Sequence, residues 1–254
     1  MVGGDPRSYV SVEGRQLGVD AESVDTDDIP IKSWEKWAVR NAILKDIPHI
    51  SWAGDFPGAA FEEIASGAGS TAVASFLTMD APANSGNAST AETRFRFTSD
   101  SVQADAYEIA QRDWDDEWWW AANYLIQQND DQRTDYLALG NRPWVGKTSI
   151  GFKLDSEKLM GFVHDGTSET TTGAISSAPG TGMVELTAHF RPGDTCEFWV
   201  GDVTVGSPDA TLSSGLPSGA RSDGTIMGEH RVTNNGNDVR RTGRIAELMM
   251  GVVA

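Results

Sequence analysis

The stretch EWWWAANYLIQ, residues 117–127, decides the fold. Side chains of a β-strand point alternately to two faces, so this stretch divides into two rows. The apolar row is made of Trp118, Trp120, Ala122, Tyr124 and Ile126. The other row mixes polar and apolar side chains, namely Glu117, Trp119, Ala121, Asn123, Leu125 and Gln127. The alternation predicts a strand that buries its apolar row in a hydrophobic core.

The same alternation recurs in later segments. Further apolar rows that we expect to face inward are Phe95 and Phe97; Ile150, Phe152 and Leu154; Val184, Leu186, Ala188 and Phe190; and Cys196, Phe198 and Val200. The other candidate strands span residues 70–79, 91–98, 135–139, 148–155, 158–166, 183–193, 196–203, 224–230 and 243–253. Clusters of Gly, Asn, Asp, Ser and Pro separate them, without intervening helical patterns. We therefore predict an all-β fold, a two-sheet antiparallel jelly roll or lectin-like β-sandwich.

Residues 1–47 differ in composition from the rest of the chain. The segment up to about residue 30 is polar and acidic and can bury little. From residue 31 the spacing is helical, with Trp34 and Trp37 on one face, and Pro48 ends the helix. A helix this short is not stable alone, so we expect both tryptophans to dock against the sandwich or a partner. The prediction is an assembly arm with a short amphipathic helix at 1–47 and a sandwich at 48–254.

The charge balance limits the partners of this protein. The chain has 37 Asp and Glu against 20 Lys and Arg, a formal net charge of −17, and only six of the 20 are lysines. Such a surface repels phosphate backbones, so we expect no nucleic-acid binding. The excess of acids with few lysines is typical of proteins that work in molar salt. There the Debye length falls to about 3 Å and self-repulsion is screened.

Disulfides, membrane insertion and most cofactors are not expected. Cys196 is the single cysteine, and its inward row predicts a buried, unreactive thiol. No apolar stretch approaches the length that crosses a bilayer, and the N-terminus lacks the pattern of a secretion signal. The four histidines are scattered without zinc spacing.

Two acidic loops are weak candidates for a structural cation. Their carboxylates are ligands that calcium or magnesium prefers, although neither loop has EF-hand spacing. The candidate ligands are Asp113, Asp115, Asp116, Asp130 and Asp131. No other cofactor is expected.

Three stretches carry a family resemblance. They are YLALGNRPWVGKTSIGFKLDSEKLMGFVHDG (136–166), VELTAHFRPGDTCEFWVGDV (184–203) and GRIAELMMGVV (243–253). Together they resemble concanavalin A-like lectin/glucanase (laminin-G-like) domains, and the resemblance covers residues 48–254. With its N-terminal arm and acidic composition, the chain also resembles decoration proteins of the capsid (turret or fibre) or tail of haloarchaeal tailed viruses.

The resemblance raises the question of catalysis. Glycosidases of this superfamily carry a Glu-x-Asp-x-x-Glu strand, which places carboxylates on one concave face. The nearest run here is Asp113, Asp115, Asp116 and Glu117, with Trp118 where the pattern needs an acid. These acids precede the strand instead of lying within it. We therefore expect a solvated acidic loop, no catalytic residues and no enzymatic activity.

Outward tryptophans and polar side chains offer a binding surface instead. Indole rings stack on sugar faces, but they are also common in contacts between subunits, and both readings stay open. Trp114, which we expect in a loop, has the same ambiguity. The candidates for a glycan site or an interface are Trp119, Asn123, Trp199, Glu197, Arg94 and Arg96.

The sequence thus predicts a non-enzymatic virion protein of a halophilic tailed virus. It would decorate the capsid or tail, contact copies of itself and other virion proteins, and bind host-surface glycans. Such a protein is assembled in the host cytoplasm and exposed outside the cell. The alternatives are a cellular carbohydrate-binding protein, or a glycoside hydrolase or lyase of the same fold.

Overall fold

The computed structural model describes most of the chain after residue 111 and shorter segments before it. Described are residues 8–12, 15–19, 49–53, 56, 61–66, 69–83, 89–95, 112–141, 147–175, 181–201, 207–220, 226–236 and 239–253. Side chains are described for 56, 69–83, 112–140, 147–175, 181–201, 207–220, 230–236 and 239–252. No helix among the described residues is long and apolar enough to cross a membrane.

The chain divides into two units, Met1–Asp46 and Ile47–Ala254. Within the described part of the first unit, β1 (Ser8–Val12) and β2 (Arg15–Val19) form an antiparallel hairpin. The helix predicted around Trp34 and Trp37 lies outside the described residues.

The second unit consists of two antiparallel sheets, which confirms the predicted β-sandwich. The seven-stranded sheet has the order β12 (Glu169–Thr171), β11 (Lys158–His164), β10 (Ser149–Asp155), β9 (Arg133–Asn141), β16 (Ile226–Asn234), β7 (Ser89–Phe95) and β4 (Phe61–Ser66). The eight-stranded sheet has the order β15 (Ala210–Leu212), β14 (Thr195–Val200), β13 (Gly182–Arg191), β8 (Glu117–Gln127), β17 (Arg241–Val253), β6 (Leu77–Ala81) and β5 (Ser70–Val73), with β3 (His49–Ala53) also paired to β17.

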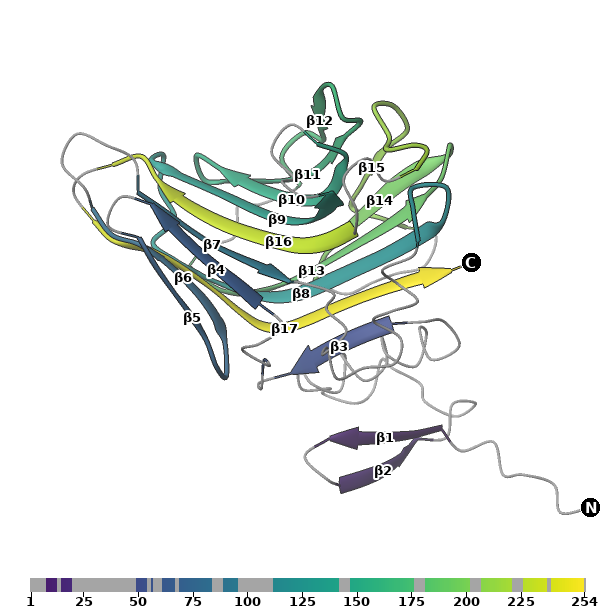
Figure 1. Ribbon diagram of the computed structural model, residues 1–254, viewed down its shortest axis with the longest axis horizontal. Coiled ribbons are helices and arrows are strands. Elements are labelled where there is room, and N and C mark those ends of the chain that lie inside the picture. Colours follow the sequence, from purple (N-terminus) through teal and green to yellow (C-terminus); the bar gives the residue numbers. More distant parts are fainter. Residues whose placement is uncertain are drawn as a thin grey trace, which may run out of the picture. The chain divides into compact units, whose positions relative to one another are not determined.

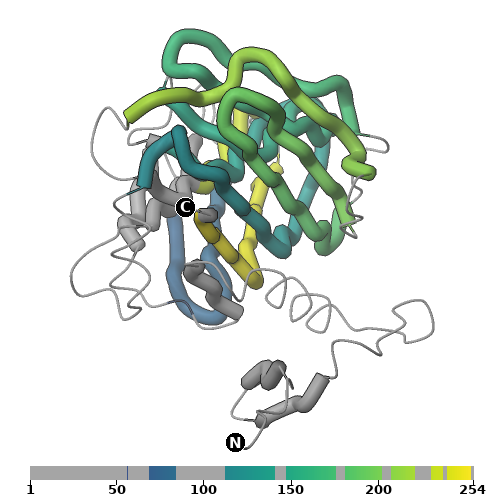
Figure 2. The backbone as a smooth tube through the Cα atoms, turned by 90° about the vertical axis from the view of Figure 1, so that its right-hand side faces the viewer, coloured from purple at the N-terminus to yellow at the C-terminus, as the bar shows by residue number. Residues whose placement is uncertain are grey.

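The strands of both sheets bow in the same direction (Figure 1). The seven-stranded sheet lies on the inner side of the bow, so its outer face is concave. Turned by 90°, the yellow strand β17 runs between teal β8 and the blue strands β5 and β6 (Figure 2), as the hydrogen bonding requires. β8 and β17 are the long central strands of the eight-stranded sheet.

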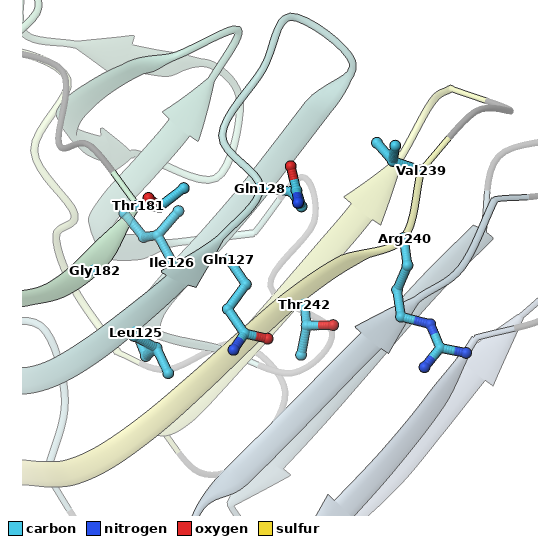
Figure 3. A pocket seen from close by; sticks show the side chains of 9 residues that line it. All are labelled: Leu125, Ile126, Gln127, Gln128, Thr181, Gly182, Val239, Arg240 and Thr242. Carbon is cyan, nitrogen blue, oxygen red and sulfur yellow. The ribbon is translucent and has the colours of Figure 1, made fainter.

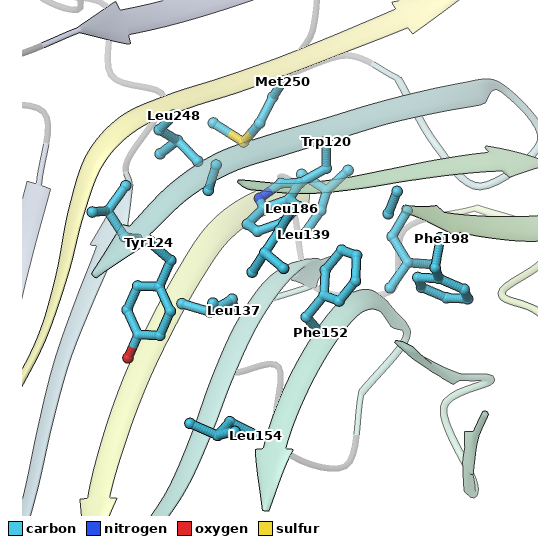
Figure 4. Close-up of a cluster of buried hydrophobic side chains, with 14 of the residues drawn as sticks. Trp120, Tyr124, Leu137, Leu139, Phe152, Leu154, Leu186, Phe198, Leu248 and Met250 are labelled. Atoms are coloured by element: carbon cyan, nitrogen blue, oxygen red, sulfur yellow. The ribbon is translucent and has the colours of Figure 1, made fainter. Parts of the chain in front are cut away.

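The core between the sheets is formed by the inward rows that the sequence predicts. The apolar row of β8 is buried; Trp120 points toward Phe152 on β10 of the opposite sheet, with ring centroids 5.9 Å apart, and Tyr124 lies beside Leu137 of β9 (Figure 4). The rings of Phe152 and Phe198 meet edge to face at 5.5 Å. Cys196 is buried as predicted, and burial raises the pKa of its thiol well above the usual value. The alternation pattern therefore holds for the strands whose side chains the structure describes, while the predicted inward pair Phe95 and Phe97 lies outside them.

Trp114 also belongs to this core, although the sequence placed it in a loop. Its ring is fully buried and lies edge to face against Phe190, with centroids 5.6 Å apart. A turn just before β8 carries Trp114 back under the sheet, where Trp118 is 6.3 Å away. A loop position had left the choice between core and surface open, and the structure assigns Trp114 to the core.

One buried polar network lies among the apolar side chains. The guanidinium of Arg133 contacts the Asp135 carboxylate at 2.7 Å, and the Tyr124 hydroxyl donates to the same carboxylate at 2.6 Å. Arg133 also donates to the carbonyl oxygen of Thr242 at 3.1 Å, which links β9 to β17. Burial raises the pKa of Asp135 even though the adjacent guanidinium lowers it. All three side chains are buried, so the network is a structural tie between the sheets.

Candidate functional site

The acidic run before β8 serves the turn that precedes the strand. The backbone N–H of Asp115 donates to the Asp113 carboxylate at 3.0 Å, and that of Asp113 donates to Asp116 at 3.2 Å. The indole of Trp118 donates to the Asp113 carbonyl at 2.7 Å. These carboxylates thus satisfy backbone donors of a tight turn, which is a common use of aspartate. The described residues contain no group of three or more His, Cys, Asp or Glu side chains that could hold a metal ion.

The second acidic loop forms an ion pair with Arg241, a buried arginine of the same chain. Both carboxylate oxygens of Asp130 accept hydrogen bonds from the Arg241 guanidinium, at 2.9 and 2.8 Å. Asp130 also accepts a bond from the backbone N–H of Gln132 at 3.0 Å. The weak cation candidate Asp130 is therefore engaged in an ion pair, while its neighbour Asp131 is exposed.

The predicted glycan or interface residues on the eight-stranded sheet do come together. On its outer face the rings of Trp119 and His189 stack at 3.7 Å, and Trp199 lies parallel to Trp119 at 6.2 Å. His189 bridges two carboxylates: Nε2 is 2.5 Å from Glu117, and Nδ1 is 3.5 Å from Glu197. The sequence analysis did not propose His189 as a site residue. It stacks on Trp119 because the two residues lie directly opposite each other on β13 and β8.

Most of this cluster is buried. Trp199 is only 2% exposed and His189 only 3%, whereas Trp119 is half-buried. Burial lowers the pKa of His189, and the neighbouring Glu117 opposes that shift. Asn123 is also buried, and its amide donates to Glu247. The assignment of these residues to a glycan site or an interface stays a prediction.

The two arginine candidates lie elsewhere. Arg94 belongs to β7 of the seven-stranded sheet, where its backbone pairs with Glu229. Its side chain, like the whole of Arg96, lies outside the described residues. Arg94 therefore lies on a strand of the other sheet from Trp119 and Trp199.

A surface cavity of about 680 Å³ lies at the ends of β8 and β17. Its lining includes Leu125, Gln127, Gln128, Thr242 and Arg240 (Figure 3). Arg240 is the one charged residue among the described lining residues, and its guanidinium is 3.5 Å from Asp80. Amide, hydroxyl and apolar groups with a single cation can bind a ligand, but they offer no acid–base pair for chemistry.

The concave face of the seven-stranded sheet holds a different constellation. β9 is the central strand of this sheet, and its inward row contains Leu137 and Leu139. Its outward row is Thr134, Tyr136, Ala138 and Gly140. In the ladder, Tyr136 is directly opposite Lys153 of β10 on one side and Arg231 of β16 on the other. A phenol thus lies between two cationic residues in a line across the middle of the concave face.

Tyr136 and Lys153 meet on one carboxylate. The Tyr136 hydroxyl donates to Glu169 Oε2 at 3.1 Å, and Lys153 Nζ donates to Oε1 of the same side chain at 3.0 Å. Lys153 Nζ also lies 5.1 Å from the centre of the Tyr136 ring. Phe162 of β11 closes the group with an edge-to-face contact to Tyr136 at 5.4 Å. The side chains of Lys153 and Glu169 are 16% and 25% exposed, so the cluster is partly open to solvent.

The protonation states of this cluster follow from its surroundings. Burial raises the pKa of the Tyr136 phenol, while the nearby ammonium of Lys153 opposes that rise. Burial alone would lower the pKa of Lys153, but its interactions with Tyr136 and Glu169 outweigh burial and raise it. At neutral pH the pair is therefore a neutral hydroxyl beside an ammonium, two donors suited to an anionic carboxylate.

The outward row of β9 has a further chemical consequence. Retaining hydrolysis of a glycosidic bond requires two carboxyl groups about 5 Å apart, one of them protonated. The outward row offers hydroxyl groups and no carboxylate, because Asp135, the acid of this strand, points inward to Arg133. The described part of β9 therefore lacks the carboxylate pair of that mechanism.

Comparison with known proteins identifies the fold. No family model matches the chain, and neither does any curated protein. Solved structures do match. A prokaryotic β-1,3-1,4-glucanase (lichenase) from a mouse hindgut metagenome shares 10% identity over 80% of this chain and 98% of its own, with a TM-score of 0.53. Bacillus licheniformis β-glucanase shares 10% over 80% and 97%, with a TM-score of 0.51.

An endo-β-1,4-glucuronan lyase from the fungus Trichoderma reesei is similar to the same extent. It shares 11% identity over 80% of this chain and 94% of its own, with a TM-score of 0.51. These likenesses contradict the expectation of a non-enzymatic protein, because enzymes that cleave polysaccharides have this fold. The chain has the concanavalin A-like β-sandwich fold of β-glucanases.

Proposed function

We propose that this protein binds and cleaves a polysaccharide along the concave face of the seven-stranded sheet. The observation that carries the proposal is the line Lys153–Tyr136–Arg231 across the centre of that face. An aromatic ring flanked by charged donors is a common way to hold a sugar, because the ring packs against C–H groups while the donors bind hydroxyl or carboxylate oxygens.

The fold supports the choice of ligand class. Glucanases and a glucuronan lyase share it over about four fifths of this chain. The outer face of the seven-stranded sheet is concave (Figure 1), β9 is the central strand of this sheet, and Tyr136 lies near the middle of β9.

Glycan binding without cleavage is the second candidate function. The outward row of β9 carries no carboxylate, so hydrolysis would have to draw its acid pair from neighbouring strands, such as β16 with Glu229 opposite Ala138. A decoration protein that holds host glycans would need binding only, and a location in a virion stays a prediction.

Binding and cleavage can be measured on a panel of neutral β-glucans and uronate polysaccharides. Calorimetry would report binding, and release of reducing ends would report cleavage. We expect Tyr136→Ala to weaken binding about tenfold or more, since it removes both the ring and the hydroxyl. Trp119→Ala, on the outer face of the other sheet, is the matched control and should bind like the wild type. Loss of binding in the Trp119 variant but not in the Tyr136 variant would refute the choice of face.

A further inference from the structure

We infer that the surface cavity at the ends of β8 and β17 is a second binding site, and that its ligand is a neutral oligosaccharide. The cavity lies on the outer face of the eight-stranded sheet, because Gln127 and Thr242 are opposite each other on the outward rows of β8 and β17 (Figure 3). The concave cluster around Tyr136 belongs to the other sheet. The second site therefore adds to the proposed function and does not depend on it.

The buried side chain of Arg133 fixes the backbone on the β8 side of the cavity. Its Nη1 donates to the carbonyl oxygens of Gln127 and Gln128, the latter at 3.0 Å, and its Nη2 donates to that of Thr242 at 3.1 Å. All three acceptors belong to lining residues. A buried guanidinium is costly unless its donors are bonded, and here those bonds hold lining residues of two strands. The exposed side chains of Gln127 and Gln128 therefore project from a fixed backbone.

A second buried arginine fixes the opposite wall. Arg241 Nη1 donates to the carbonyl oxygen of Val239 at 3.0 Å, and the Asn234 amide donates to the same oxygen at 2.9 Å. Arg241 is itself held by both carboxylate oxygens of Asp130. Val239 lines the cavity, so its backbone is as firmly held as that of the β8 residues. Walls that are ordered before the ligand arrives reduce the entropy that binding costs.

The polar groups of the cavity suit hydroxyl groups better than a charged ligand. The amides of Gln127 and Gln128 each offer donors and an acceptor, as a sugar hydroxyl does. The charge of Arg240 is balanced by Asp80, whose carboxylate is 3.5 Å away and also accepts from the Thr242 hydroxyl at 2.9 Å. An anionic ligand therefore meets no net positive charge here, whereas a neutral sugar can bond to the amides.

Apolar side chains beside the amides complete a surface for a sugar. Met183 is 50% exposed and lies opposite Leu125, a lining residue, while Val239 is 36% exposed. The C–H groups of a sugar ring can cover such surface while its hydroxyls bond to the amides. The cavity volume of about 680 Å³ is within the range of about 300–1,000 Å³ that is usual for small-ligand sites. A short oligosaccharide therefore matches the cavity in size and in chemistry.

NMR signals of the side-chain amides report directly on this site. Tetrasaccharides of β-1,3-1,4-linked glucose and of β-1,4-linked mannose are the neutral probes, and an oligogalacturonate of the same length is the anionic probe. At millimolar concentration a neutral probe should shift the amide signals of Gln127 and Gln128, in the wild type and in Tyr136→Ala alike. No shift with either neutral probe would overturn the site. Larger shifts with the galacturonate would overturn the neutral ligand class, and shifts that vanish in Tyr136→Ala would overturn the independence of the two faces.

Matched variants test the location. Gln127→Ala and Gln128→Asn should each weaken tetrasaccharide binding about three- to tenfold, the effect of losing one hydrogen bond. Asparagine is chosen because it tolerates the left-handed backbone of Gln128, whose φ is 60°. Gln132→Ala, in the same hairpin turn but outside the lining, should bind like the wild type. Unchanged affinity in both lining variants, or an equal loss in Gln132→Ala, would place the sugar elsewhere and overturn the inference.

Discussion

Acid stability offers a direct test of how the sandwich interior is built. His230 of β16 lies between the sheets, fully buried, and both of its ring nitrogens lack a hydrogen-bond partner. The nearest ring described is that of Trp120, with centroids 6.2 Å apart, and its indole N–H is also without a partner. Burial lowers the pKa of His230 from 6.5 to about 3. The folded protein therefore needs this histidine neutral.

The size of the effect follows from linkage between protonation and folding. Because the pKa of His230 is depressed in the folded state, the unfolded chain binds more protons between pH 6.5 and 3. The stability that neutral His230 contributes is therefore fully present above pH 6.5, and it is lost progressively as the pH falls toward 3. One pKa unit corresponds to about 1.4 kcal/mol. The burial of His230 alone should therefore lower the free energy of unfolding by about 3 kcal/mol at pH 4 relative to pH 7.

His230→Leu removes the titrating group and keeps an apolar side chain of similar size. Urea unfolding of wild type and variant at pH 7 and pH 4 gives four free energies of unfolding. We expect the loss between the two pH values to be about 3 kcal/mol smaller in the variant. His164→Leu is the control, because His164 lies on the outward row of β11 and accepts a bond from the Gly166 N–H at 3.0 Å. Equal losses in wild type and His230→Leu would refute the reasoning.

Two further substitutions test the packing and the buried network, both by urea unfolding. A Cβ at Gly161 would lie 2.5 Å from Phe198 Cγ, so Gly161→Ala should lower the free energy of unfolding by about 1–3 kcal/mol. Gly173→Ala, with no atom within 4 Å of its Cβ, should change it little, and equal effects would contradict the close approach. Arg133→Leu leaves the Asp135 carboxylate buried without its ion pair and should cost about 3–5 kcal/mol. A cost below about 1 kcal/mol would show that the pair is not desolvated.

The core could be predicted from the sequence because alternation is a local signal. Trp118, Trp120 and Tyr124 face inward as their period of two requires, and so does Phe152 in the opposite sheet. Trp114 could not be placed, because its burial depends on a turn geometry made by aspartate side chains and not on periodicity. Local sequence patterns therefore predict which face of a strand a side chain occupies, but they do not predict whether a residue in a turn is buried.

The concave-face cluster could not be found from the sequence for a different reason. Tyr136, Lys153 and Glu169 are spread over 136–169, and they meet only through the register of three strand pairs and the short edge strand β12. The alternation along β10 puts Lys153 on the outward row, but no local pattern tells which residues of the neighbouring strands flank it. Register is fixed by the whole sheet, so the site becomes visible only with the sheet order.

The expectation of no enzymatic activity failed because it depended on one mechanism. It required a carboxylate pair on a strand, and the acids before β8 were rejected for lack of that pattern. The rejection of those acids agrees with the structure, where Asp113 and Asp116 serve a turn. The error lay in judging activity from one sequence pattern, whereas the fold is shared with enzymes that cleave polysaccharides.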